Sequence, residues 1–376
     1  MQKARGFNSC QPQPLKVKDV VMAAIREYHL FAGIGGGIYG GRLLGHTCVG
    51  AVEIMPYARA VLAQRKKDGW MDKDMDIDSH FDITKLNGES IRGAFDVLCG
   101  GFPCQAFSTA AHGKNIAEKN LWNHMLRIVK ESCAPIVFGE NVVLRAIEKA
   151  RIDLESAGYK VERIRLGCED LGADHRRNRF WLLAVRNDRS GRDAFERLAV
   201  HIGSLPRLTG KCWTKSPSET GAAIEVAPCD RREQLLGIGN AQSPFVAASA
   251  FRVLVNRHLN PVEGRREKVS GDELARVFMP MKTWITKEFR ESADPAKYID
   301  GLVHTPTTMA NYACPSMMKH EGCRNFTKVF RRPEPINGEW LMGFPLGASS
   351  PHPVPKSNAA CKSKRGFAKV NEGLSL

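Results

Sequence analysis

Short apolar runs alternate with amphipathic segments along much of the chain. Runs of about four to eight apolar residues are typical of buried strands, and apolar positions three and four apart are typical of helices. Such an alternation predicts an α/β fold with a Rossmann-like sheet. The runs predict strands ending near residues 30, 52, 82, 98, 138, 166 and 185, and helices at 38–44, from 56, at 121–129, at 143–158 and after 244.

A glycine-rich turn follows the first predicted strand, in Leu-Phe-Ala-Gly-Ile-Gly-Gly-Gly at 30–37. A turn between a strand and a helix allows a ligand to approach the backbone, although a plain tight turn has the same pattern. Glu53 ends the second strand, about 20 positions later, where a carboxylate accepts from ribose hydroxyls or caps the helix beginning near Pro56. We expect Asp82, at a third strand end, to accept from an exocyclic amine, with a helix N-cap as the alternative.

Cys104 follows an apolar strand at 95–98 and the sequence Cys-Gly-Gly-Phe-Pro. The pattern predicts a tight loop that presents one thiol at the carboxyl end of a strand, where open α/β sheets bind ligands. A lone cysteine in a turn is more often structural. Glu140 ends another predicted strand, so we expect it to face the same crevice, and the polar segment 109–119 has the composition of a mobile covering loop.

Basic residues are concentrated in one part of the chain. The formal net charge is +15 and the isoelectric point is near 9.4, which favours a polyanionic partner, nucleic acid above all. Between positions 175 and 216 there are 10 Lys and Arg against 3 Asp and Glu. If the arginines at 176, 177 and 179 enter a strand, Arg177 and Arg179 share a side and Arg176 lies opposite. A solvated strand edge is the alternative.

The composition limits the class of protein. The 376 residues are 43% hydrophobic, as in globular proteins, and suggest two or three domains. No apolar run is long enough to span a membrane, and we see no secretory signal. The odd number of cysteines, 11, without framework spacing, indicates reduced thiols and a cytoplasmic protein. Cys314, His320 and Cys323 fit no standard zinc spacing, so we expect no metal.

The composition also divides the chain into segments, and no internal repeat is found. Met22 is an alternative start, because the folded pattern begins just after it. The predicted segments are a flexible lead (1–25), an α/β core (26–186), a basic irregular interval (187–234), a segment with an amphipathic helix (235–258), a further region (259–348) and a disordered basic tail (349–376).

Several of these stretches, taken together, resemble the DNA (cytosine-5)-methyltransferase family over about residues 26–258. The most specific are Gly-Phe-Pro-Cys-Gln at 101–105 and Glu-Asn-Val at 140–142, with 36 residues from Cys104 to Glu140. His175-x-Arg177-x-Arg179 resembles the family's Gln-x-Arg-x-Arg, with histidine in place of glutamine, and Gly239-Asn240-Ala241 matches a late motif that returns to the cofactor pocket. Thr305-Pro-Thr and the sequence at 339–345 look like those of phage and prophage members. The family resemblance implies that 26–186 is the catalytic and cofactor-binding core, that 235–258 returns to that core and that 259–348 is the target-recognition region.

The resemblance implies covalent catalysis. Cys104 would add to C6 of cytosine, Glu140 would hydrogen-bond or protonate ring N3, and Arg177 and Arg179 would donate to the base carbonyl. S-adenosylmethionine would supply the methyl group, no metal is required, and the target nucleotide would flip out of the duplex. The implied cofactor-binding residues are Phe31, Ala32, Gly33, Gly35, Gly36, Glu53, Ile54, Asp82, Ile83 and Asn240, and the implied DNA-binding residues are Gln105, Ser108 and Arg176.

The implied partner is double-stranded DNA, bound by a monomer in the cytoplasm of a bacterial or phage-infected cell. The short basic interval before the late motif places target recognition mostly in the C-terminal region. A cognate restriction endonuclease would be a functional partner. The alternatives are a tRNA-directed relative and a catalytically inactive DNA-binding relative. A hydride-transfer enzyme is the weakest reading, because it leaves Pro-Cys-Gln unexplained.

Overall fold

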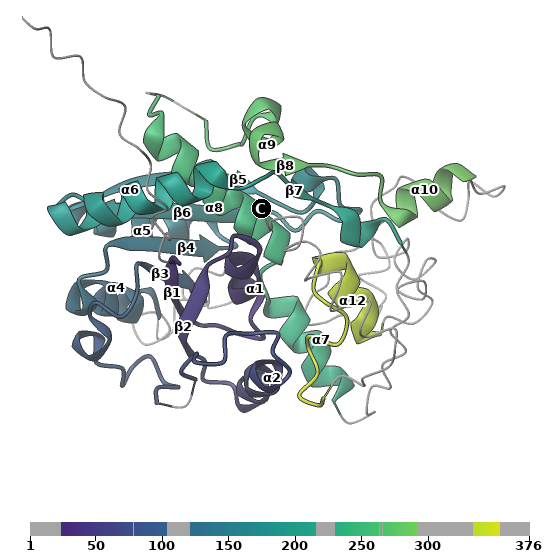
Figure 1. Ribbon diagram of the computed structural model, residues 1–376, viewed down its shortest axis with the longest axis horizontal. Helices are drawn as coiled ribbons and strands as arrows, with labels where there is room; N and C mark the ends of the chain where they lie inside the picture. Colours follow the sequence, from purple (N-terminus) through teal and green to yellow (C-terminus); the bar gives the residue numbers. More distant parts are fainter. Residues whose placement is uncertain are drawn as a thin grey trace, which may run out of the picture.

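The computed structural model describes residues 24–77, 79–103, 121–215, 230–262, 264, 266–291 and 334–353. A six-stranded sheet has the strand order β2-β1-β3-β4-β6-β5 (Figure 1). The first four strands in that order run parallel, and β6 is antiparallel to both of its neighbours. The strands are β1 (Arg26–Leu30), β2 (Thr47–Val52), β3 (Val97–Gly101), β4 (Ile136–Asn141), β5 (Tyr159–Leu166) and β6 (Arg179–Arg186). The predicted α/β class is therefore confirmed.

Helices cover both faces of this sheet (Figure 1). On one face lie α1 (Gly36–Leu43), α6 (Arg189–Ser204) and α8 (Pro244–Leu259), and on the other lie α4 (Leu121–Ser132) and α5 (Leu144–Ser156). Helix α2 (Pro56–Lys67) packs beside β2. The remaining elements include α7 (Arg231–Asn240), α9 (Gly271–Val277), α10 (Trp284–Glu291), α12 (Pro335–Met342) and a small pair of strands, β7 (Leu208–Thr209) with β8 (Phe278–Met279). Within the described ranges, no helix is both long and apolar enough to cross a membrane.

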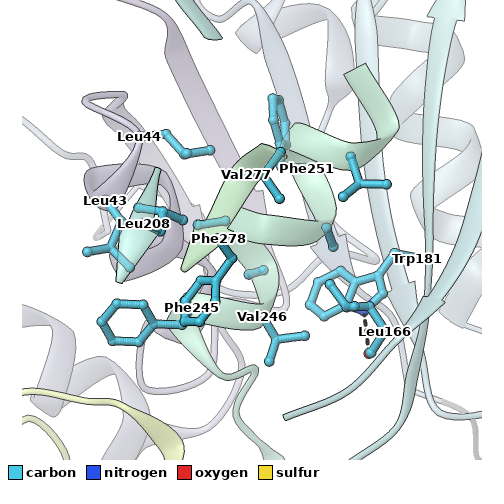
Figure 2. Close-up of a cluster of buried hydrophobic side chains, with 14 of the residues drawn as sticks. Leu43, Leu44, Leu166, Trp181, Leu208, Phe245, Val246, Phe251, Val277 and Phe278 are labelled. Atoms are coloured by element: carbon cyan, nitrogen blue, oxygen red, sulfur yellow. Dashed lines mark hydrogen bonds between the residues drawn. The ribbon is translucent and has the colours of Figure 1, made fainter. Parts of the chain in front are cut away.

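Alternate residues of the central strands enter different cores, as the pleat of a strand requires. Cys99 of β3 belongs to the core beneath α8, whereas Leu98 belongs to the core beneath α4 and α5. In the first of these cores the rings of Phe251 of α8 and of Trp181 both pack against Phe138, with centroid distances of 5.0 and 5.5 Å. The indole N–H of Trp181 donates to the carbonyl oxygen of Leu166 at 3.1 Å (Figure 2). Helix α8, which follows the late motif, packs on the sheet through β5 and β6 and also packs on α1.

Two predictions about local structure are wrong. The interval after β6 is not irregular throughout, because residues 189–204 form the helix α6, which Asp188 caps by accepting from the N–H of Gly191. No strand ends at Asp82 either. That residue lies in a turn, where its carboxylate accepts from the N–H and the hydroxyl of Thr84.

The C-terminal described segment, 334–353, packs into the core. Helix α12 lies beside α7 (Figure 1), and the indole N–H of Trp213 donates to the carbonyl oxygen of Trp340 at 3.0 Å. Ser349 is fully buried, and its N–H and hydroxyl both donate to the carboxylate of Glu339. The prediction of a disordered tail is therefore wrong for residues 349–353, and the part of the predicted recognition region in α12 joins the core. Residues 354–376 lie outside the described residues.

Candidate active site

The turn after β1 takes left-handed backbone conformations at three positions. Phe31, Gly33 and Gly35 have φ angles of 55°, 54° and 93°. Gly35 caps α1, and a Cβ atom on the next residue, Gly36, would lie 2.2 Å from the carbonyl oxygen of Gln242. The glycines therefore serve both the tight turn and the close approach of the α7–α8 connection, in addition to any ligand.

Glu53 reaches this turn from the end of β2. Its Oε2 accepts from the N–H of Gly33 at 2.7 Å, and its Oε1 accepts from the N–H of Met55 at 2.8 Å. The carboxylate is buried beside the turn, while the following Ile54 is 62% exposed. The structure therefore brings Glu53 to the predicted cofactor turn, and the apolar side chain of Ile54 is exposed to solvent beside it.

Asp82 and Ile83 lie in a turn that is anchored from a helix. Arg127 of α4 donates to the carbonyl oxygens of Ile83 and Leu86, both at 2.8 Å. The hydroxyl and the N–H of Thr84 lower the pKa of Asp82. Ile83 is buried in the core beneath α4. The cavity described next does not include this pair, so its placement at a binding site remains a proposal.

A cavity opens at the carboxyl ends of β1, β3 and β4, between the turn after β1 and the α7–α8 connection. Parallel α/β sheets bind ligands at this edge. The cavity lining includes Phe31, Ala32, Gly33, Glu140 and Asn240, which are five of the predicted site residues. Gly101 also lines it, at the end of the strand that leads to Cys104.

Glu140 lies directly opposite Gly101 in the register of β4 against β3. Its side chain is about one-tenth exposed, and Nε of Arg179 lies 3.1 Å from its Oε1. This is an ion-pair contact whose angle does not make a hydrogen bond, because Oε1 accepts none from the described residues. The amide of Gln242 donates to Oε2 at 3.3 Å. The carboxylate is therefore held in the cavity lining, with one buried oxygen that accepts no hydrogen bond from the described residues.

The three arginines have different environments, and the prediction that strand alternation sets their sides is wrong. Strand β6 begins only at Arg179, and Arg177 has a φ angle of 45°. Arg177 is buried, and its Nη2 donates to the carbonyl oxygens of Gly239 and Ala241 at 2.8 and 2.6 Å. Burial, together with the charge of Arg179, lowers the pKa of Arg177 to about 9. Arg176 is exposed and lies 3.5 Å from Glu169.

A buried polar cluster forms the floor of the cavity, and sequence reasoning missed it. Glu27 accepts from His29 at 2.9 Å and from His46 at 2.6 Å. Cys99 of β3 lies beside His29 of β1. Burial alone would raise the pKa of Glu27, but the two histidines lower it to about 2. The alternation of β1, which puts residues 27 and 29 on one face, was the available signal.

Residues 25–208 match the family model described as C-5 cytosine-specific DNA methylase. This part of the chain belongs to that family. A Type II methyltransferase, M.HhaI of Haemophilus parahaemolyticus, is 30% identical over 186 residues, which are 46% of this chain and 53% of that protein. M.MspI of Moraxella sp is 29% identical over 183 residues, which are 45% of this chain and 41% of that protein. The chain thus spans about half the length of these curated relatives.

A third relative of the methylase family, M.Eco47II of Escherichia coli, is 30% identical over 241 residues, 57% of this chain and 55% of that protein. Among solved structures, a DNA modification methyltransferase encoded within an E. coli prophage aligns with a TM-score of 0.36 and 26% identity. It covers 43% of this chain and 47% of that chain. DNMT2 of Spodoptera frugiperda aligns with a TM-score of 0.36 and 20% identity, covering 44% and 51%.

Some predicted residues of the methylase site lie outside the described residues, namely Cys104, Gln105 and Ser108. The structure does place the strand that leads to them. Asn141, which sequence reasoning did not single out, donates to the carbonyl oxygen of Phe102 at 2.8 Å. Its place beside Glu140 in the Glu-Asn-Val motif was the signal that could have found it. Cys314, His320 and Cys323 also lie outside the described residues.

Proposed function

We propose that this protein transfers a methyl group from S-adenosylmethionine to C5 of cytosine in duplex DNA, with Cys104 as the nucleophile. One observation carries the proposal. Glu140 lies next to Arg179 and opposite Gly101 on the adjacent parallel strand. Gly101 is three residues before Cys104. A carboxyl group and a thiol that leave the same edge of a sheet are suited to act on one ring.

The residues at the turn after β1 suit the proposed cofactor. The buried carboxylate of Glu53 lies beside the turn, where its oxygens would accept hydrogen bonds from ribose hydroxyls. Ile54 provides an exposed apolar surface for a base. Asn240 ends α7 on the other side of the cavity. Phe31, Ala32, Gly33, Gly35 and Gly36 form the turn itself. S-adenosylmethionine, when bound, supplies an electrophilic methyl group.

The chain's own residues would divide the chemistry between them. The thiolate of Cys104 adds to C6 of cytosine, and the ring gains electron density at C5. Glu140 stabilises that charge by a hydrogen bond or a proton to N3, through a carboxyl oxygen that has no other hydrogen-bond partner among the described residues. After C5 has taken the methyl group, loss of the C5 proton and expulsion of Cys104 restore the aromatic ring.

Arg179 and Arg177 would have different roles, one toward the base and one in the fold. Arg179 lies beside Glu140, which lines the cavity, and would donate to the base carbonyl. Arg177 donates to the α7–α8 connection, so we assign it to holding that connection in place. The net charge of +15 suits a duplex that must be bound before one nucleotide flips into the cavity. Exposed Arg176, with Gln105 and Ser108, is proposed to contact DNA.

The test is to incubate the protein with methyl-labelled S-adenosylmethionine and either duplex DNA or tRNA. Label in DNA supports the proposal, label only in tRNA replaces the substrate, and DNA binding without label indicates an inactive relative. Label that persists in Cys104→Ser would show that the nucleophile is wrong. Bisulfite sequencing of DNA from expressing cells would give the target, and the methylated sequence would then show whether it protects against a co-encoded restriction endonuclease.

A further inference from the structure

Gln242 lies in the connection between α7 and α8, where the polypeptide passes between two other elements of the site. A Cβ atom on Gly36 would lie 2.2 Å from its backbone oxygen. A Cβ on Gly37 would lie 2.7 Å from its Oε1, and a Cβ on Gly101 would lie 2.8 Å from its Nε2. Three glycines from α1 and β3 thus leave the space that this one residue fills.

The two ends of the Gln242 amide face different groups. Its Nε2 donates to Oε2 of Glu140 at 3.3 Å. Its Oε1 lies beside Gly37, 2.7 Å from the position that a Cβ atom there would take. Nδ1 of His29 lies 3.2 Å from that same Cβ position. The ring of His29 is fixed on its other side by Glu27. The amide nitrogen is therefore directed to the carboxylate and the amide oxygen to the buried polar cluster.

This arrangement gives the two oxygens of Glu140 different tasks. Oε2 is occupied by Gln242, whereas Oε1 accepts no hydrogen bond from the described residues and lies beside Arg179. Without the amide, the carboxylate could rotate and present either oxygen. We infer that Gln242 is a positioning residue that fixes the Glu140 carboxyl group so that Oε1 faces the target base, an inference that rests on the function proposed above.

The glutamine amide provides a donor that suits the carboxylate. Its nitrogen donates to Oε2, whereas its oxygen is directed to the buried polar cluster. Leucine at this position would have a similar volume and no donor. Displacement of a reacting group by about 1 Å can cost on the order of a hundredfold in rate, so we expect Gln242→Leu to lower kcat by about ten- to a hundredfold.

The experiment compares Gln242→Leu with Gln234→Leu. The control variant removes the side-chain amide of a buried glutamine in α7. Duplex DNA containing 5-fluorocytosine traps the covalent adduct with Cys104, because the C5 fluorine cannot leave as a proton. We expect Gln242→Leu to slow trapping by about ten- to a hundredfold, with the Kd values for DNA and S-adenosylmethionine kept within about threefold. Gln234→Leu should trap at the wild-type rate. Gln242→Asn, which keeps the amide on a shorter chain, should recover part of the loss.

Wild-type trapping by Gln242→Leu would overturn the inference, and so would a rate loss matched by an equal loss of cofactor affinity. A second measurement does not depend on activity. Gln242→Leu, Glu140→Ala and the double variant form a cycle in the equilibrium constant of unfolding, and a direct contact predicts non-additivity of about threefold or more. If the wild-type protein labels no nucleic acid, the proposed function fails, and an additive cycle would separately reject the contact between Gln242 and Glu140.

Discussion

The side-chain amide of Asn141 donates to the carbonyl oxygen of Phe102 across the β4–β3 boundary, at 2.8 Å. Its Oδ1 accepts from the N–H of Val143, also at 2.8 Å, so both ends of the amide are used. Asn141 is buried directly after Glu140. The residue that follows the proposed acid therefore holds the backbone two residues before the proposed nucleophile.

This contact predicts that Asn141→Ala slows the addition of Cys104 and destabilises the fold. A buried carbonyl that loses its donor costs about 1–3 kcal/mol of unfolding free energy. The loop beyond Phe102 would also lose a fixed starting point, so trapping on 5-fluorocytosine DNA should slow. Asn87→Ala, which removes the cap of a short 3₁₀ helix at 88–91 on the surface, provides a control that should trap normally. Equal trapping by both variants would show that the contact does not position the loop.

Substitution of Arg177 should mainly lower thermal stability, whereas substitution of Arg179 should mainly lower the rate of methylation. Arg177 is buried and donates to two backbone carbonyls, so Arg177→Lys loses at least one of these hydrogen bonds and should lower the thermal midpoint. Arg179 lies beside Glu140 of the cavity lining, so Arg179→Lys should lower kcat more than it lowers the midpoint. Thermal unfolding and single-turnover methylation on both variants decide this. The assignment fails if Arg177→Lys unfolds like the wild type but methylates poorly.

The sequence predicted much of the sheet because strands such as β3 and β4 are apolar on both faces and are followed by residues that typically end a strand. It also predicted that Glu140 meets the strand leading to Cys104, since parallel strands end at one edge. It failed at Asp82, where a turn closed by Thr84 resembles the end of a strand. It failed at α6 because basic residues on an exposed face concealed a helix with a buried stripe of small and apolar residues.

The contacts of Gln242 and the left-handed backbone of Arg177 depend on long-range packing. Nothing in the local sequence shows that α8 approaches α1 closely enough for Gln242 to reach Glu140. Arg177 was predicted from strand alternation, a rule that holds only inside a strand. Residues 349–353 were assigned to the tail by composition, although Ser349 binds a buried carboxylate ten positions earlier.

His175 should make the protein sensitive to mild acid. Burial, with the charges of Arg177 and Arg179, lowers its pKa to about 3 from a usual 6.5. The unfolded chain therefore binds a proton below pH 6.5 that the folded chain refuses until about pH 3, so stability is lost as the pH falls through that window. The full difference corresponds to about 5 kcal/mol at about 1.4 kcal/mol per pH unit.

His175→Gln is therefore expected to lose less unfolding free energy than the wild type between pH 7.5 and pH 5. Chemical denaturation at the two pH values measures this. Glu27 does not contribute in that range, because its lowered pKa acts only between about 4.5 and 2. His258, whose pKa burial lowers to about 4, should leave a residual dependence in the variant. Identical pH dependence in the two proteins would show that His175 is not the sensitive group.

Two helical glycines should respond in opposite ways to alanine. A Cβ on Gly41 of α1 would lie 2.0 Å from Oε2 of Glu27, whereas a Cβ on Gly203 of α6 would meet no atom within 4 Å. Alanine favours helix by up to about 1 kcal/mol over glycine, so Gly203→Ala should stabilise the fold. Gly41→Ala must displace a buried carboxylate from two histidines, which should cost several times that gain, on the order of 3 kcal/mol or more. Denaturant unfolding of both variants at pH 7.5 gives the two signs directly, and a stabilising Gly41→Ala would show that the Glu27 cluster moves aside at little cost.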